Sequence, residues 1–266
     1  MPRSLIAALA ALLLAGAAAP ARADLAEIQK RGRLRVLVMP DTRRPEFFSV
    51  KPAAPPGFDH ELLLAFAKLH RLTLEPVAVG SWDALIPALN DGKGDLVAGR
   101  FTATAARSKL VAFSKEVFPT RNVVITRKPH RPVASLEELR AERVGTIKGT
   151  SMAEAIATAA VPPANVDDSL AAGSFGEALK SGQVTAAVWG VESAIALQRE
   201  DPEIQLGMFL GPPGSLAWAV RKDSPQLLQA LDEYIENTRR TPTWNRLVVK
   251  YFGEAAPEVL RKARPE

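Results

Sequence analysis

The stretch SWDALIPALNDGKGDLVAGRFTATAARSKLVAFS, residues 81–114, decides the fold. Apolar residues recur at helical spacing in its first third, which predicts an amphipathic helix from the N-cap candidate Ser81 to Asn90. Residues 96–98 form a short apolar run that predicts a buried strand. A helix that leads into a buried strand is the repeating unit of α/β proteins, so we expect further units of this kind elsewhere in the chain.

Polar residues follow this predicted strand directly. Thr102, Thr104 and Arg107 lie just beyond its carboxyl end, where open α/β sheets bind ligands. A guanidinium offers a planar fork that matches a carboxylate, so this group predicts a site for a small anion. The alternative reading of the stretch alone is that Arg107 is a surface charge and the threonines cap a helix.

The same alternation occurs twice along the chain. A first series of strands and helices precedes the proline-rich residues 128–132, and a second series follows them. Two long helical segments close the chain. We therefore predict an α/β protein with two lobes, each a mostly parallel sheet flanked by helices, with a ligand cleft between them. The predicted parts are lobe 1 (24–127 and 221–252), lobe 2 (128–220, inserted) and a C-terminal tail (253–266) that forms a short, fraying helix.

Residues 1–23 carry the features of a secretory signal peptide. Arg3 precedes an apolar run rich in alanine and leucine, and residues 21–23 read A-R-A, a cleavage-site pattern. The apolar run is short for a transmembrane helix. We expect export, cleavage before Asp24 and a periplasmic location.

Composition excludes several classes of function. The chain has no cysteine and three histidines, so thiolate metal sites and disulfides are excluded and a zinc site has few ligands to draw on. The net charge of +5 is too small to indicate nucleic-acid binding. Neither a phosphate-binding loop nor a dinucleotide fingerprint has the required spacing. We expect no cofactor, no metal and no nucleic-acid partner.

Two further segments contribute candidates for the site. Residues 149–151, G-T-S, join a predicted strand to a predicted helix, and the hydroxyls of Thr150 and Ser151 with the helix N-terminus suit an anion. Simple helix capping explains them about equally well. Trp82 is either a core residue or one wall of a pocket.

In order and spacing these segments resemble the family 3 extracellular solute-binding proteins, the periplasmic amino-acid receptors of ABC importers. The resemblance extends from Gly32 to about Phe252, and no single motif decides it. The motifs that carry it are G-x-L-x-V (32–36), G-F-D-x-E-L (57–62), W-x-x-L-I-P-A-L-x-x-G-x-x-D (82–95), T-x-T-x-x-R (102–107), F-S (113–114) and V-G-x-x-x-G-T-S (144–151).

The resemblance implies a two-lobe, type II periplasmic-binding-protein fold and a monomer that delivers its ligand to an ABC permease. It implies that Arg107 clamps a ligand carboxylate, that Thr102 and Ser151 contact the ligand, and that Trp82 packs against the ligand's side chain. Thr150, Arg100 and Glu192 complete our set of candidate ligand-binding residues; we predict no catalytic residue.

The sequence departs from the family pattern at three points. Relatives carry an aspartate after a strand of the second lobe to hold the ligand's ammonium, whereas Gly190 stands there and Glu192 is the nearest acid. An aromatic residue expected after the first strand is replaced by residues 42–44, T-R-R, and Arg100 precedes Thr102 where small residues are commoner. An unpaired ammonium in a closed cleft is costly, so these departures favour an acidic ligand.

Two other functions stay open at this point. The fold also resembles periplasmic cyclohexadienyl dehydratases, for which Glu192 or Glu61 is the candidate acid. A sensory or accessory module is the third alternative, because murein transglycosylases carry a similar domain.

Overall fold

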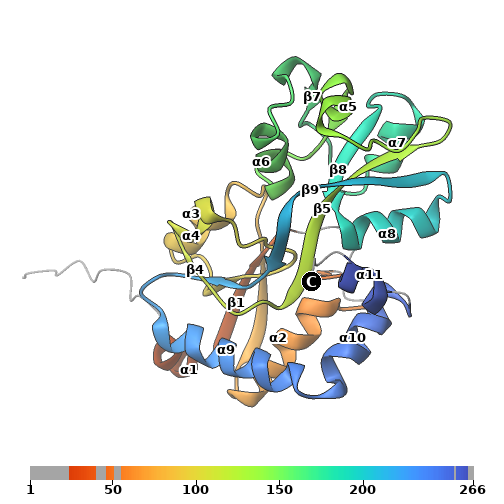
Figure 1. The fold of residues 1–266 in the computed structure, drawn as a ribbon. Coiled ribbons are helices and arrows are strands. Elements are labelled where there is room, and N and C mark those ends of the chain that lie inside the picture. Colours follow the sequence, from red (N-terminus) through yellow and green to blue (C-terminus); the bar gives the residue numbers. More distant parts are fainter. Residues whose placement is uncertain (1–23, 40–45, 51–54, 255, 263–266) are drawn as a thin grey trace, which may run out of the picture.

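The computed structural model describes residues 24–39, 46–50, 55–254 and 256–262. They form two five-stranded sheets, each flanked by helices, which make two lobes (Figure 1). The sheets have the strand orders β2-β1-β3-β10-β4 and β7-β6-β8-β5-β9. The strands are β1 (Arg33–Val38), β2 (Thr73–Ala78), β3 (Leu96–Val97), β4 (Ala112–Phe113), β5 (Phe118–Arg127), β6 (Val144–Gly145), β7 (Val166–Asp167), β8 (Ala186–Gly190), β9 (Ile204–Leu216) and β10 (Ala219–Val220).

The helices lie where apolar residues recur at helical spacing. In the first lobe they are α1 (Leu25–Arg31), α2 (Phe58–Leu69), α3 (Leu85–Asn90), α4 (Ala105–Ser108), α9 (Pro225–Arg239), α10 (Pro242–Phe252) and α11 (Ala256–Lys262). In the second lobe they are α5 (Leu136–Ala141), α6 (Ser151–Thr158), α7 (Phe175–Lys180), α8 (Val191–Glu200) and the short 3-10 helix at Pro163–Asn165. No helix within the described residues combines the length and apolar character needed to cross a membrane.

Both sheets are mostly parallel, as predicted. In the first sheet β10 pairs antiparallel with β3 and β4, so it alone runs against the other strands. In the second sheet β5 pairs antiparallel with β8 and β9 and is the single reversed strand. The two-lobe α/β fold class is therefore confirmed.

The chain passes between the two sheets at residues 114–117 and 217–218. Strand β5 belongs to the second sheet along its whole length, and β10 belongs to the first. The predicted boundaries at 127/128 and 220/221 assign both strands to the opposite lobes. The predicted boundaries were placed at prolines and polar residues of the sequence. The sheet to which a strand belongs depends instead on its hydrogen-bonded pairing with distant strands.

The predicted N-cap at Ser81 is wrong. Helix α3 begins at Leu85, and Ser81 instead accepts a backbone hydrogen bond from Ala84 (3.2 Å) in a turn before the helix. The ring of Trp82 is carried by this turn and is 9% exposed. The predicted signal peptide (1–23) and residues 42–44 lie outside the described residues.

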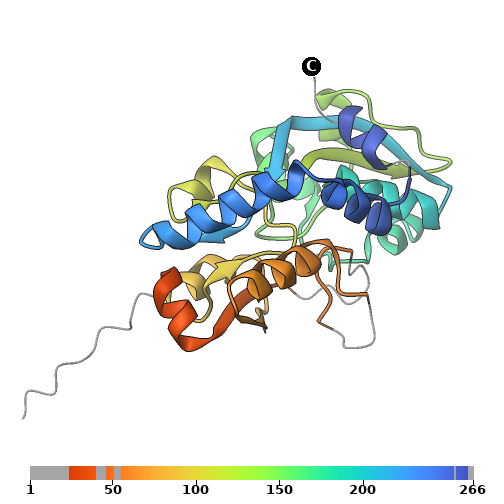
Figure 2. The same ribbon diagram turned by 90° about the horizontal axis from the view of Figure 1, so that it is seen from below.

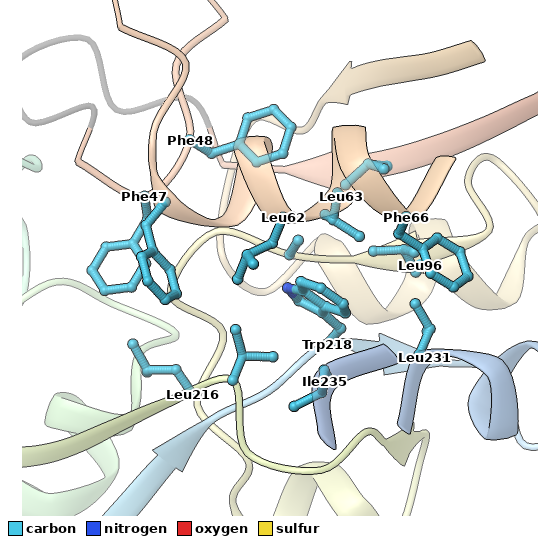
Figure 3. Close-up of a cluster of buried hydrophobic side chains, with 14 of the residues drawn as sticks. Phe47, Phe48, Leu62, Leu63, Phe66, Leu96, Leu216, Trp218, Leu231 and Ile235 are labelled. Atoms are coloured by element: carbon cyan, nitrogen blue, oxygen red, sulfur yellow. The ribbon is translucent and has the colours of Figure 1, made fainter. Parts of the chain in front are cut away.

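An aromatic cluster fills the core of the first lobe close to the passage into β5 (Figure 3). The ring of Phe118, the first residue of β5, lies 5.2 Å from those of Phe47 and Phe58 and 4.8 Å from that of Phe252. Gly57 allows this packing, because a β-carbon there would overlap the backbone of Phe47. The core of the first lobe therefore anchors one of the two connections to the second.

The C-terminal segment is a helix, as predicted. Figure 2 shows α9 and α10 following one another along one side of the molecule. Helix α11 packs against α10 and also against α8 of the second lobe, and Leu260 is buried in the first lobe's core.

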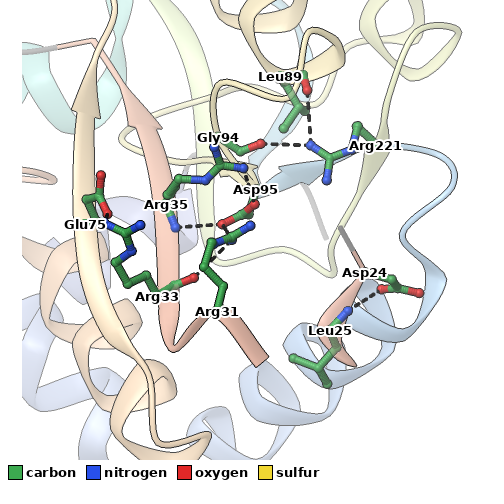
Figure 4. A network of polar contacts seen from close by, with 10 residues as sticks. All are labelled: Asp24, Leu25, Arg31, Arg33, Arg35, Glu75, Leu89, Gly94, Asp95 and Arg221. Atoms are coloured by element: carbon green, nitrogen blue, oxygen red, sulfur yellow. Dashed lines mark hydrogen bonds and ion pairs between the residues drawn. The ribbon is translucent and has the colours of Figure 1, made fainter. Parts of the chain in front are cut away.

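A network of charges lies in the first lobe away from the connection to the second (Figure 4). Asp95 is fully buried before β3 and forms ion pairs with Arg31 and Arg35, and its carboxylate also accepts the backbone N–H of Arg35 at 2.8 Å. Arg221 donates to the backbone oxygens of Leu89 (3.2 Å) and Gly94 (2.8 Å). This network ties the start of β3 to β1.

Candidate functional site

The first lobe contributes the residues that follow β3. Gly99 and Arg100 both have left-handed backbone conformations (φ +84° and +65°), which turn the chain at the strand end. Thr104 then caps α4 by accepting the N–H of Arg107 at 3.3 Å. The guanidinium of Arg107 stacks on the ring of Phe101 at 4.3 Å, and the residue is only 7% exposed. Burial lowers the pKa of Arg107, while the charges of two nearby acids raise it.

The second lobe contributes the ends of β6 and β8. After β6, Gly149 (φ +75°) turns the chain into α6, and the hydroxyl of Thr150 caps that helix by accepting the N–H of Ala153 at 3.3 Å. After β8, α8 begins at Val191 and places Glu192 in its first turn. The expected capping role of Thr150 is therefore real, and it does not prevent the residue from lining the site.

Side-chain hydrogen bonds join these two groups of residues across the lobes. Arg107 Nη2 donates to the backbone oxygen of Gly149 at 2.9 Å, while its Nη1 donates to that of Thr102 at 2.9 Å. The hydroxyl of Ser151 donates to Thr102 Oγ1 at 3.1 Å. Arg100 Nη1 donates to Ser193 Oγ at 2.7 Å. The two predicted strand-end groups thus meet directly at the interface between the lobes.

A cavity of about 30 Å³ lies at this meeting point. All seven residues that we predicted from the sequence line it, and six others complete the lining. The predicted residues are Trp82, Arg100, Thr102, Arg107, Thr150, Ser151 and Glu192, and the others are Thr120, Asn122, Met152, Trp189, Gly190 and Leu216.

The sequence analysis missed the contribution of β5. Thr120 and Asn122 lie in this strand, and the register that pairs Asn122 with Gly190 brings them to the cavity. Their alternate spacing, which places both side chains on one face of the strand, was the available signal. Trp189, at the end of β8, could have been found by the strand-end argument that led to Arg107.

Glu192 occupies the space beside Gly190. A β-carbon on Gly190 would overlap its carboxyl group, so this carboxyl lies where a side chain at position 190 would begin. Thr120 Oγ1 donates to Glu192 Oε2 at 2.7 Å. Burial raises the pKa of Glu192, the charge of Arg100 lowers it and that of Glu46 raises it. The cavity therefore contains an acid, as the inclusion of Glu192 among the candidate ligand-binding residues predicted.

Trp82 supplies a hydrogen-bond donor. Its indole N–H is buried and has no hydrogen-bond partner among the described residues, although buried polar groups are normally paired. The residue lines the cavity, so a ligand there can accept this hydrogen bond.

Glu61 lies elsewhere. Its carboxylate is bonded to Lys250 and Tyr251, between α2 and α10 of the first lobe. It does not line the cavity, which leaves Glu192 as the acid in the cleft. The described residues hold no group of three or more histidine, cysteine and acidic side chains placed to bind a metal ion.

The model of the bacterial extracellular solute-binding proteins, family 3, matches residues 34–254. The chain belongs to this family. Among curated relatives, the membrane-bound lytic murein transglycosylase F of Stutzerimonas stutzeri is 26% identical over 252 residues, covering 92% of this chain and 51% of that protein. A probable histidine-binding protein of Campylobacter jejuni is 26% identical over 201 residues, covering 73% of this chain and 76% of that protein. This solute-binding protein thus spans about half the length of the first of these relatives.

Solved structures agree with this membership. The arginine-bound amino acid ABC transporter substrate-binding protein AbpA of Streptococcus pneumoniae has a TM-score of 0.76 and 25% identity, covering 86% of this chain and 98% of that one. An ancestral amino-acid-binding protein, described as a precursor of cyclohexadienyl dehydratase, has a TM-score of 0.74 and 27% identity, covering 86% and 99%.

Proposed function

We infer that this family 3 solute-binding protein captures a small solute that carries a carboxylate, and that it does so by closing its two lobes around the solute. The observation that carries the inference is that Arg107 of the first lobe and Thr150 and Ser151 of the second line one cavity. A guanidinium has five N–H donors, and the described contacts to backbone oxygens use two of those of Arg107. Binding and lobe closure are coupled, because a ligand held by both lobes stabilises the closed conformation of the protein.

The amino-acid-binding relatives support a role in uptake. The protein would present its closed form to an ABC permease in the inner membrane, working in the periplasm as a monomer after removal of residues 1–23. The first indication of this route is the secretory pattern of that segment.

The charges around the cavity favour an acidic ligand. Arg100 and Arg107 contribute two positive charges, and Glu192 contributes one acid whose neutral form burial favours. A dicarboxylate or an acidic amino acid would balance this excess better than a neutral or basic amino acid. The ligand of highest affinity is therefore an organic acid or an acidic amino acid.

Calorimetry on the purified protein tests this preference. The panel is L-glutamate, L-aspartate and succinate against L-glutamine, L-histidine and L-arginine. We expect binding of at least one of the first three compounds and weaker binding of the others. Tight binding of arginine or histidine without any binding of the acids would contradict an acidic ligand, while leaving capture of a carboxylate-bearing solute intact.

The Glu192→Gln variant tests whether the charge of Glu192 controls how ligand binding depends on pH. Because its pKa is raised, lowering the pH protonates Glu192 within the folded protein and removes a negative charge from the cavity. As the pH is lowered through this raised pKa, the wild type should therefore bind an anionic ligand more tightly, by roughly tenfold once Glu192 is protonated. Glu192→Gln should abolish most of this pH dependence. If the variant instead loses binding at every pH, Glu192 holds a ligand cation and the acidic preference is wrong.

A dehydratase-like enzyme is the second candidate. A buried acid with a raised pKa, set between Thr120 and the charge of Arg100, is suited to donate a proton to a bound substrate. The ancestral dehydratase precursor among the similar structures supports this alternative. Turnover of prephenate or arogenate by the purified protein, lost in Glu192→Gln, would establish it.

A further inference from the structure

Arg100 adopts a backbone conformation that side-chain-bearing residues rarely take. Its φ is +65°, and it follows Gly99 at φ +84°. No glycine stands at position 100 to relieve this turn, so other contacts must hold it. The turn matters to the site because it points the guanidinium of Arg100 across the interface, where it donates to Ser193 at 2.7 Å and lies 5.9 Å from the ring of Trp189.

Asp59 supplies the contact that holds this turn. It is the second residue of α2, it is 3% exposed, and its Oδ2 accepts the backbone N–H of Gly99 at 2.8 Å. Burial raises the pKa of this carboxylate, while the backbone N–H of Gly99, the indole of Trp218 and the backbone N–H of Arg100 lower it. Burial outweighs these three contacts and the pKa of Asp59 rises to about 6, so the group is mostly ionised at neutral pH and accepts the Gly99 hydrogen bond as a carboxylate.

No ion pair within the described residues explains why the carboxylate of Asp59 is buried. Within the described ranges no lysine, arginine or histidine forms a salt bridge with Asp59, in contrast to the equally buried Asp95, which has two arginine partners. A buried carboxylate without a cation lowers stability unless its hydrogen bonds offset the loss of water. The 2.8 Å hydrogen bond comes from Gly99 in the turn that carries Arg100, and the indole of Trp218, outside the turn, also stabilises the charged carboxylate.

We propose that Asp59 is a positioning residue for lobe closure: by holding the turn at residues 99–100 it places Arg100 against Ser193 and Thr102 against Ser151. Asp59 lies in neither half of the cavity lining, so it acts through the turn and not on the solute. The proposal deepens the closure mechanism inferred above, yet it concerns contacts within the protein and can be tested without a ligand.

Two measurements on the ligand-free protein test it, with Asp59→Ala and the milder Asp59→Asn beside the wild type. The first is amide hydrogen exchange at residues 99–103 and 189–193. We expect exchange in both segments to be about tenfold faster in Asp59→Ala, the scale of one lost hydrogen bond, and less accelerated in Asp59→Asn, which keeps one acceptor. The second is the distance between spin labels on Leu69→Cys and Lys180→Cys, two exposed positions in different lobes of a chain that has no cysteine.

In Asp59→Ala the distribution of distances between the two spin labels should broaden toward longer values. Asp95→Asn is the matched control: it removes a buried carboxylate from the same lobe and should lower stability without changing the exchange at 99–103 or the label distances. The proposal is overturned if Asp59→Ala and Asp59→Asn lose stability while both readouts stay at wild-type values. Because no solute is present, failure to find a ligand in the calorimetric panel leaves this result unaffected.

Discussion

Arg107→Ala is expected to weaken binding of the carboxylate solute by a factor of about a hundred or more, the scale of charge-assisted hydrogen bonds in a buried site. Two losses combine in this variant. The solute loses the guanidinium that its carboxylate would contact, and the closed form loses the hydrogen bond from Arg107 to Gly149 at 2.9 Å. Calorimetry with whichever acid of the panel binds the wild type measures the change.

Two further variants make this result specific. Arg107→Lys keeps the positive charge but not the planar fork, so we expect it to recover only part of the affinity. Arg127→Ala removes an arginine that pairs with Asp201 and does not line the cavity, so its affinity should match the wild type. Unchanged affinity in Arg107→Ala would show that the solute's carboxylate binds elsewhere.

Phe118→Ala is expected to lower the free energy of unfolding by about 3–5 kcal/mol. Its ring is fully buried among Phe47, Phe58, Phe252 and Trp244, with centroids 4.8–5.9 Å away, and these rings come from three segments: the loop before α2, the start of α2, and α10. Removing it leaves a cavity that such a packed cluster fills only in part. Urea unfolding followed by tryptophan fluorescence measures the loss.

Leu110→Ala serves as the control for this variant. Leu110 is 57% exposed in the same lobe, so its replacement should change the free energy of unfolding by less than about 0.5 kcal/mol. A loss below about 1 kcal/mol in Phe118→Ala would mean that the surrounding rings close over the gap. The passage from the core into β5 would then be less rigid than the packing indicates.

The candidate site was predictable to the extent that local sequence places polar residues after strands. Arg107, Thr102 and Ser151 follow predicted strands, and parallel strands of an α/β sheet end at the same edge, so each group could be assigned to a strand end without a structure. Thr120 and Asn122 could not be found in this way. Asn122 reaches the cavity through the antiparallel pairing of β5 with β8, and Thr120 lies opposite Gly214 in the pairing of β5 with β9. Both pairings join segments more than sixty residues apart.

The position of the Glu192 carboxyl is a second feature that the sequence alone could not predict. The sequence indicated that position 190 lacks an acid, and that much is correct. The first turn of α8 folds the carboxyl of Glu192 back over Gly190, because a glycine leaves room there. Whether an acid enters the cleft was therefore decided by the geometry of a helix start.

The sequence by itself determined the α/β class, the two series of strands and helices, and the residues that stand at the strand ends, because periodicity and turn residues are local properties. Only the tertiary structure decided which strand joins which sheet, that the turn at residues 99–100 is held by Asp59, and that Arg107 reaches Gly149 in the other lobe. These features depend on contacts between residues far apart in the chain. Such contacts form only when the whole core packs, and local preference does not specify them.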